Sequence, residues 1–140
     1  MGTQQLLMFI LGFVIVAIAI YTGVKVMNGY NQNQIYHTII SDLTNFRALA
    51  HTYYQTSKTL GGSSMGTYNW TASDIANYIG VGYNGSNGLE TSSATIEVSL
   101  QGTNNEEVVF LAESKDGILD YKIQMIYNVR TSEVAINKIY

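Results

Sequence analysis

The chain has 140 residues, the length of a single domain, and its net charge at pH 7 is only −3. Its 7 basic side chains are scattered rather than gathered into a stripe, so we predict no nucleic-acid partner. It contains no cysteine, which excludes a disulfide framework and a thiolate site, and no proline, which permits a long uninterrupted helix.

The N-terminal part of the chain is strongly apolar. Residues 6–24, LLMFILGFVIVAIAIYTGV, carry no charge, and the first charged side chain is Lys25. A helix needs about 20 apolar residues to cross the hydrocarbon core of a membrane, so this segment has the minimum length of a membrane span. The preceding MGTQQ lacks the positive charge of a secretory signal, so we expect the segment to be retained rather than cleaved.

An amphipathic pattern follows without a stop signal. Its apolar residues recur every three or four positions, which predicts one helical stripe. They are Ile35, Tyr36, Ile39, Ile40, Leu43, Phe46, Leu49, Ala50, Tyr53 and Tyr54. We therefore expect one helix over about residues 3–57, roughly 80 Å long. A body made from the remaining residues is only about 25 Å across, so much of this helix must be buried by lipid or by other chains.

The remaining residues show the pattern expected of a small globular head. SKTLGGSSMGTYNW (57–70) is a loop, and Thr71, Asp74 and Gly80 predict a short helix over about 72–79. After the loop 82–88 the period becomes two, and turn-like segments separate four candidate strands, which predicts an antiparallel meander. The strands are expected within 94–100, 107–113, 118–127 and 133–140.

Together these patterns predict an α+β fold, with a long N-terminal helix packed on a small C-terminal antiparallel sheet of about four strands. The first half of the helix is apolar and the second half is amphipathic. We expect the helix to occupy residues 1–57, with a membrane or filament-core segment at about 6–24, and the head to occupy residues 58–140.

Two interpretations of the retained apolar segment remain. A plain membrane anchor explains the apolar run, but it does not explain why an amphipathic stripe continues in helical register. An assembly surface explains both, because the segment could lie in lipid first and pack against identical segments afterwards. The small residues Gly12, Ala17, Ala19 and Gly23 would allow helices to approach closely.

The leader MGTQQ, the apolar run, the amphipathic helix, the Gly-rich loop and the terminal meander resemble a type IV pilin or pseudopilin. The resemblance covers the whole chain as architecture, and its sequence support lies in MGTQQLLMFILGFVIVAIAI. It implies a filament subunit that polymerises through its N-terminal helix, with itself as partner. It also implies a precursor in the inner membrane, an assembly machinery and a final place in a cell-surface filament.

The chain departs from the pilin pattern at three features. Pilins typically carry a glutamate at the fifth position of the mature chain, whereas Gln4 and Gln5 are uncharged here; an amide can accept a hydrogen bond from a neighbour's ammonium but forms no ion pair. If processing follows Gly2, the mature chain starts at Thr3 and neither glutamine is fifth. The usual helix-breaking proline and the Cys-bounded loop are also absent.

We predict the subunit contacts to lie on the apolar segment and the residues just before it. The candidate residues are Gln4, Gln5, Leu6, Leu7, Phe9, Ile10, Gly12, Phe13, Ile15, Val16, Ile20 and Gly23. A pseudopilin of a secretion or uptake system, and a monomeric membrane-anchored binding domain, are the alternative functions.

No reaction chemistry is apparent in the sequence, so we predict no enzyme, no cofactor and no metal site. His37 and His51 are close to four helical turns apart, roughly 20 Å, which is too far to share a metal within one chain. Glu106 and Glu107 lie at a predicted turn, where adjacent side chains diverge. Asn69 and Asn84 begin N-glycosylation sequons in predicted loops.

Overall fold

A computed structural model describes residues 2–64 and 69–140 of the chain. It confirms the α+β class: one long N-terminal helix precedes a short 3-10 helix, a second helix and an antiparallel sheet. The bounds are α1 Thr3–Gln55, the 3-10 helix Lys58–Leu60, α2 Ala72–Ile79, β1 Gly88–Glu90, β2 Ala94–Gln101, β3 Glu107–Ser114, β4 Lys122–Asn128 and β5 Val134–Ile139.

The helix α1 belongs to two compact units. One unit ends at Gln34 and the other begins at Ile35, so the boundary falls inside the helix. The first unit holds the apolar half of α1. The second holds the amphipathic half together with α2 and the sheet.

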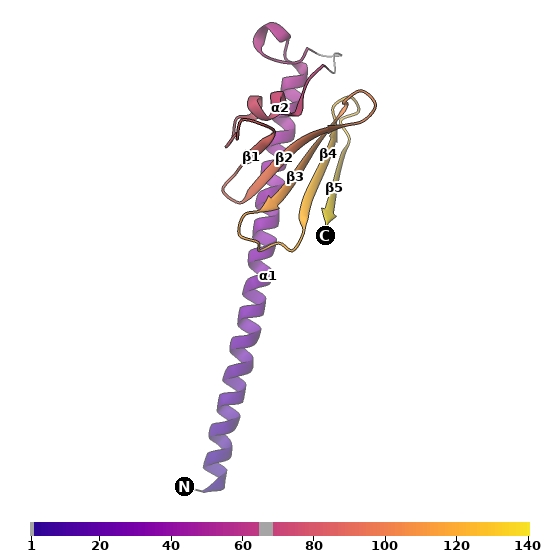
Figure 1. Cartoon of the computed structure of the whole chain (residues 1–140). Coiled ribbons are helices and arrows are strands. Elements are labelled where there is room, and N and C mark those ends of the chain that lie inside the picture. Colours follow the sequence, from indigo (N-terminus) through magenta and orange to yellow (C-terminus); the bar gives the residue numbers. More distant parts are fainter. Residues whose placement is uncertain (1, 65–68) are drawn as a thin grey trace. The chain divides into compact units, whose positions relative to one another are not determined.

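In the second unit, α1 packs on one face of the sheet (Figure 1). Its stripe of buried residues repeats with the helical period, as the sequence predicts: Ile39, Leu43, Phe46, Ala50, Tyr53 and Tyr54. Leu49 is an exception, because it lies about 120° around the helix from Leu43 and is exposed. The ring of Phe46 lies 6.4 Å from that of Phe110, in the middle of the sheet.

The sheet is a meander in which strands follow one another in the order β1-β2-β3-β4-β5, all antiparallel. Because side chains alternate along a strand, one set faces α1 and forms the core. These core residues are Ala94, Ile96, Val98, Val108, Phe110, Ala112, Ile123, Met125 and Tyr127.

The expected number of strands, about four, is one too low. The extra strand is β1, in which Leu89 is buried against the sheet and pairs with Ile96. Three residues are too few to display a period of two, so this strand has no signature in the sequence. The third candidate strand, 118–127, begins later than expected, at Lys122, because the chain bends at residues 119–121.

The helix α2 begins and ends as the sequence predicts. The Thr71 side chain accepts a hydrogen bond from the backbone N–H of Asp74, whose carboxylate accepts one from the backbone N–H of Thr71. At its other end Gly80 adopts a left-handed conformation with φ 72°, which glycine accommodates without strain. α2 buries Ile75, Ala76 and Ile79.

Candidate assembly surface

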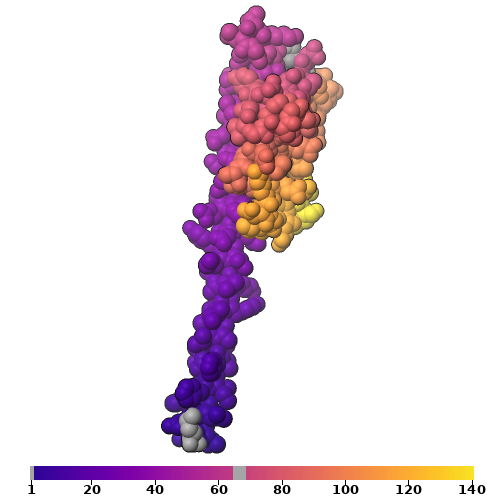
Figure 2. Space-filling view, turned by 60° about the vertical axis from the view of Figure 1, so that its left-hand side comes forward, coloured from indigo at the N-terminus to yellow at the C-terminus, as the bar shows by residue number. Residues whose placement is uncertain are grey.

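The first half of α1 exposes apolar side chains around its whole circumference. Every residue from Gly2 to Gln34 is exposed, and the large apolar ones between Leu6 and Tyr30 keep 49–77% of their surface. Figure 2 shows these side chains, in indigo, projecting from the visible side of the helix. Exposed apolar surface of this extent marks a contact with protein or with membrane.

α1 is also the one helix of the described residues that is long and apolar enough to cross a membrane. The Thr22 hydroxyl suits such surroundings, because it donates to the carbonyl of Ile18, one turn earlier. The polar group is thereby satisfied inside the helix. A membrane anchor and a signal sequence near the N-terminus both satisfy this criterion of length and composition, and the apolar window of α1 is exposed throughout.

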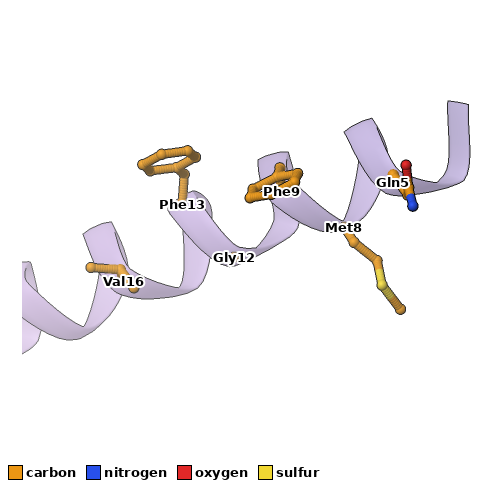
Figure 3. Close-up of a pocket in the computed structure, with 6 residues that line it drawn as sticks. All are labelled: Gln5, Met8, Phe9, Gly12, Phe13 and Val16. Carbon is orange, nitrogen blue, oxygen red and sulfur yellow. The ribbon is translucent and has the colours of Figure 1, made fainter. Parts of the chain in front are cut away.

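Gly12 creates a notch in this surface. Figure 3 shows that it carries no side chain, while its neighbours one turn before and after project around it. The notch is lined by Gln5, Met8, Phe9, Gly12, Phe13 and Val16. A Cβ placed at Gly12 would have no neighbour within 4 Å, so nothing in the subunit itself requires glycine there.

A second shallow groove adjoins the notch nearer the N-terminus. It is lined by Thr3, Gln4, Gln5, Leu7, Met8 and Leu11. Gln5 and Met8 line both grooves, so the two are continuous along the helix. Apart from the two glutamines and Thr3, the lining is entirely apolar, which suits another apolar surface rather than a polar ligand.

Helical geometry places most predicted contact residues on the side that carries Gly12. At about 100° per residue, nine of them lie within roughly 100° of Gly12: Gln4, Gln5, Phe9, Gly12, Phe13, Ile15, Val16, Ile20 and Gly23. Leu6, Leu7 and Ile10 lie on the far side. Met8 was missed, although it stands four residues before Gly12 and that spacing could have identified it.

Two of the other small residues lie on the Gly12 side of the helix, whereas the third and the one charged residue lie on the opposite side. Ala19 and Gly23 lie within about 20° of Gly12, whereas Ala17 and Lys25 lie about 140° away from it. No residue from Gly2 to Val24 is charged, and Lys25 lies away from the Gly12 side. A helix could approach closely on this side without burying an unpaired ammonium.

The histidines do not come together in the head. The His37 ring is exposed beside Tyr36, while His51 hydrogen-bonds through Nδ1 to the Tyr127 hydroxyl, 2.5 Å away. Arg47 lies over the Tyr127 ring, 5.6 Å from its centroid. Across residues 2–64 and 69–140, no three His, Cys, Asp or Glu side chains are grouped so that they could hold a metal ion.

The remaining candidate residues lie in loops or at strand ends. Glu106 precedes β3 and faces Arg130 at 3.8 Å, and Glu107 begins that strand. Asn69 is exposed, whereas Asn84 folds back and accepts hydrogen bonds from the backbone N–H groups of Ser86 and Gly88. No protein-family model, curated protein or solved structure matches this chain.

Proposed function

We propose that the chain is the structural subunit of an extracellular, type IV pilus-like filament, which polymerises through the first half of α1. The observation that carries the proposal is that the apolar half of α1 is exposed on all sides, whereas the second half buries its apolar stripe against the sheet. A continuous helix joins the two halves.

Energetics support a membrane-inserted precursor. If about 15 apolar side chains each lose about 50 Å² of exposed surface at roughly 25 cal/mol/Å², the gain relative to water approaches 20 kcal/mol. A free chain in water would therefore aggregate. Relative to lipid most of that gain disappears, because lipid tails are as apolar as the side chains. The subunit would wait in the inner membrane and leave it with the help of an assembly machinery.

The Gly12 side gives the proposed filament its specificity. Without a hydrophobic driving force in lipid, helices associate through close packing, and a notch allows closer approach than a smooth apolar surface. The neighbouring glutamines could hydrogen-bond to a second chain, since Gln5 carries both a donor and an acceptor. The heads would then form the outer surface of the filament.

Removal of detergent from the purified full chain tests the proposal. We expect a sharp transition from micelle-bound subunits to long, uniform filaments, visible by negative-stain electron microscopy and pelleted by centrifugation. No lipid is added, because the proposed subunit would remain inserted in vesicles without its assembly machinery. If removal of the detergent yields only amorphous aggregates and no filaments, the proposal is wrong.

A further inference from the structure

The sheet has two edges, formed by β1 and β5, and only the β1 edge is covered by another described segment of the chain. At the β1 edge, the backbone N–H of Glu90 donates to the Val81 carbonyl, and the backbone N–H of Asn84 donates to the Gly88 carbonyl. The Asn84 side chain also accepts from the N–H of Gly88. The chain's own segment 81–84 therefore covers this edge, as proteins commonly do to prevent strand pairing.

The β5 edge is open. β5 is the last strand of the sheet, and no other described segment pairs with its outer side. All six of its residues are exposed, although its apolar members Val134, Ile136 and Ile139 keep only 38–43% of their surface. It contains no proline, and its register with β4 runs without a bulge from Val134 to Ile139. An edge with these properties is a template for another strand.

The register fixes which backbone groups point outward. The N–H of Asn128 donates to the Glu133 carbonyl, and hydrogen-bonded pairs alternate along an antiparallel ladder. Residues 133, 135, 137 and 139 therefore bond to β4. The backbone groups of Val134, Ile136 and Lys138 face away from the sheet and lack a partner strand.

The side chains of the same three residues continue the face that packs on α1. Val134 stands opposite Tyr127 and Ile136 opposite Met125, both of which are buried, whereas Val134 and Ile136 stay partly exposed. Lys138 is held to one side, 5.0 Å from the Tyr36 ring centroid and 4.7 Å from that of Tyr121. An added strand would extend the sheet and cover this apolar pair.

From these features we infer that β5 pairs with β5 of a second copy of the chain, antiparallel and centred on Ile136. We choose a second copy as the partner because a two-fold axis through Ile136 places the outward N–H and C=O groups of β5 opposite the C=O and N–H groups of the other copy. Ile136 then faces its own counterpart, and Val134 faces Lys138 of the other copy in both directions. All three outward residues form hydrogen-bonded pairs, and no two like charges stand opposite each other. The β1 edge is closed, so β5 is the strand that a second copy can offer.

The pairing joins subunits that point in opposite directions. β5 runs antiparallel to α1, because its start lies near Tyr127, which contacts His51, and its end lies near Tyr36 (Figure 1). Two chains related by this axis therefore have antiparallel helices in their heads. Such pairs cannot repeat within one polar filament. If the proposed filament function holds, they join neighbouring filaments that run in opposite directions into bundles.

Cysteine cross-linking of the full chain in detergent micelles tests the pairing. The natural chain has no cysteine, so single variants at positions 134, 135, 136, 137 and 138 report one contact each. Opposite residues in a hydrogen-bonded antiparallel pair have Cα atoms about 5.5 Å apart, which a disulfide can span. Thr95→Cys, exposed on the interior strand β2, is the matched control for random collision. Diamide is the added oxidant, and the readout is the dimer band on a non-reducing gel.

We expect dimer yield to peak at Ile136→Cys, at least about tenfold above Thr95→Cys, since pairing raises the effective concentration of the two thiols. Val134→Cys and Lys138→Cys should cross-link poorly alone and well when the two variants are mixed. A flat profile across β5, or a peak at another position, would overturn the inference. In micelles the detergent covers the apolar half of α1, so no filament needs to form during the assay. The cross-linking result is therefore independent of whether the chain forms filaments.

Discussion

Gly12→Leu separates the stability of the subunit from its assembly. Within the subunit the substitution is harmless, because a Cβ at this position has no neighbour within 4 Å. Leucine also has the higher helix propensity, so the helix should gain about 0.8 kcal/mol. Membrane insertion should be unchanged or improved, since the variant is more apolar.

Assembly should suffer because the new side chain fills the notch. Phe9, Phe13 and Val16 surround Gly12 and keep 56–75% of their surface for a neighbouring helix. If the leucine holds that neighbour off about 100 Å² of apolar surface, the contact loses roughly 2.5 kcal/mol at 25 cal/mol/Å². That loss weakens each contact by between about ten- and a hundredfold. A filament makes the contact once per subunit, so the loss should prevent polymerisation.

The assay compares filament yield after detergent removal, by sedimentation and electron microscopy, with subunit stability measured in detergent. Gly29→Leu is the matched control, because Gly29 also has no neighbour within 4 Å but lies beyond the apolar run, next to Asn28. We expect filaments from Gly29→Leu and none from Gly12→Leu. Normal filaments from Gly12→Leu, or equal loss from both variants, would refute the role given to the notch.

Three further predictions concern the head. Ile136→Pro should lower the free energy of unfolding of the head by about 1 kcal/mol less than Asn137→Pro does, measured by urea denaturation. The reason is that only Asn137 uses its backbone N–H in the ladder to β4. Equal losses would contradict the assigned backbone orientation. Burial and the negative charge of Asp74 raise the pKa of Tyr53 above its ordinary value. The unfolded chain then loses this proton first, so stability should fall as the pH rises above about 10, and Tyr53→Phe should flatten that part of the profile in alkaline titrations. Thr71→Ala should cost about 1 kcal/mol, measured by tryptophan fluorescence in urea, since it removes the cap of α2; an unchanged midpoint would exclude that role.

Much of the fold follows from local patterns in the sequence. The apolar stripe of α1 has the helical period, and the Thr71–Asp74 spacing that predicts a capping box forms one in the structure. Both signals are strong because they involve residues within one turn of each other. The strands with alternating residues were similarly visible, whereas β1 was too short to show a pattern.

Features that depend on distant residues were not predictable. The Trp70 indole N–H donates to the carbonyl of Asn105, 35 residues away, and no local pattern indicates this bond. The exposure of Val134 and Ile136 likewise depends on which strands α1 covers. For the assembly surface, the sequence identified the glycines, but only the helical arrangement of their neighbours separates the Gly12 side from the side of Lys25.

Electron microscopy of filaments sheared from the source cells, with intact-mass analysis of the same fraction, shows whether this chain forms filaments in its natural setting. We expect long thin filaments made of this chain, with the first half of α1 in their core and the heads outside. If cells that express the chain contain it only as a membrane-bound monomer, the chain is not a filament subunit and the apolar half of α1 is an anchor.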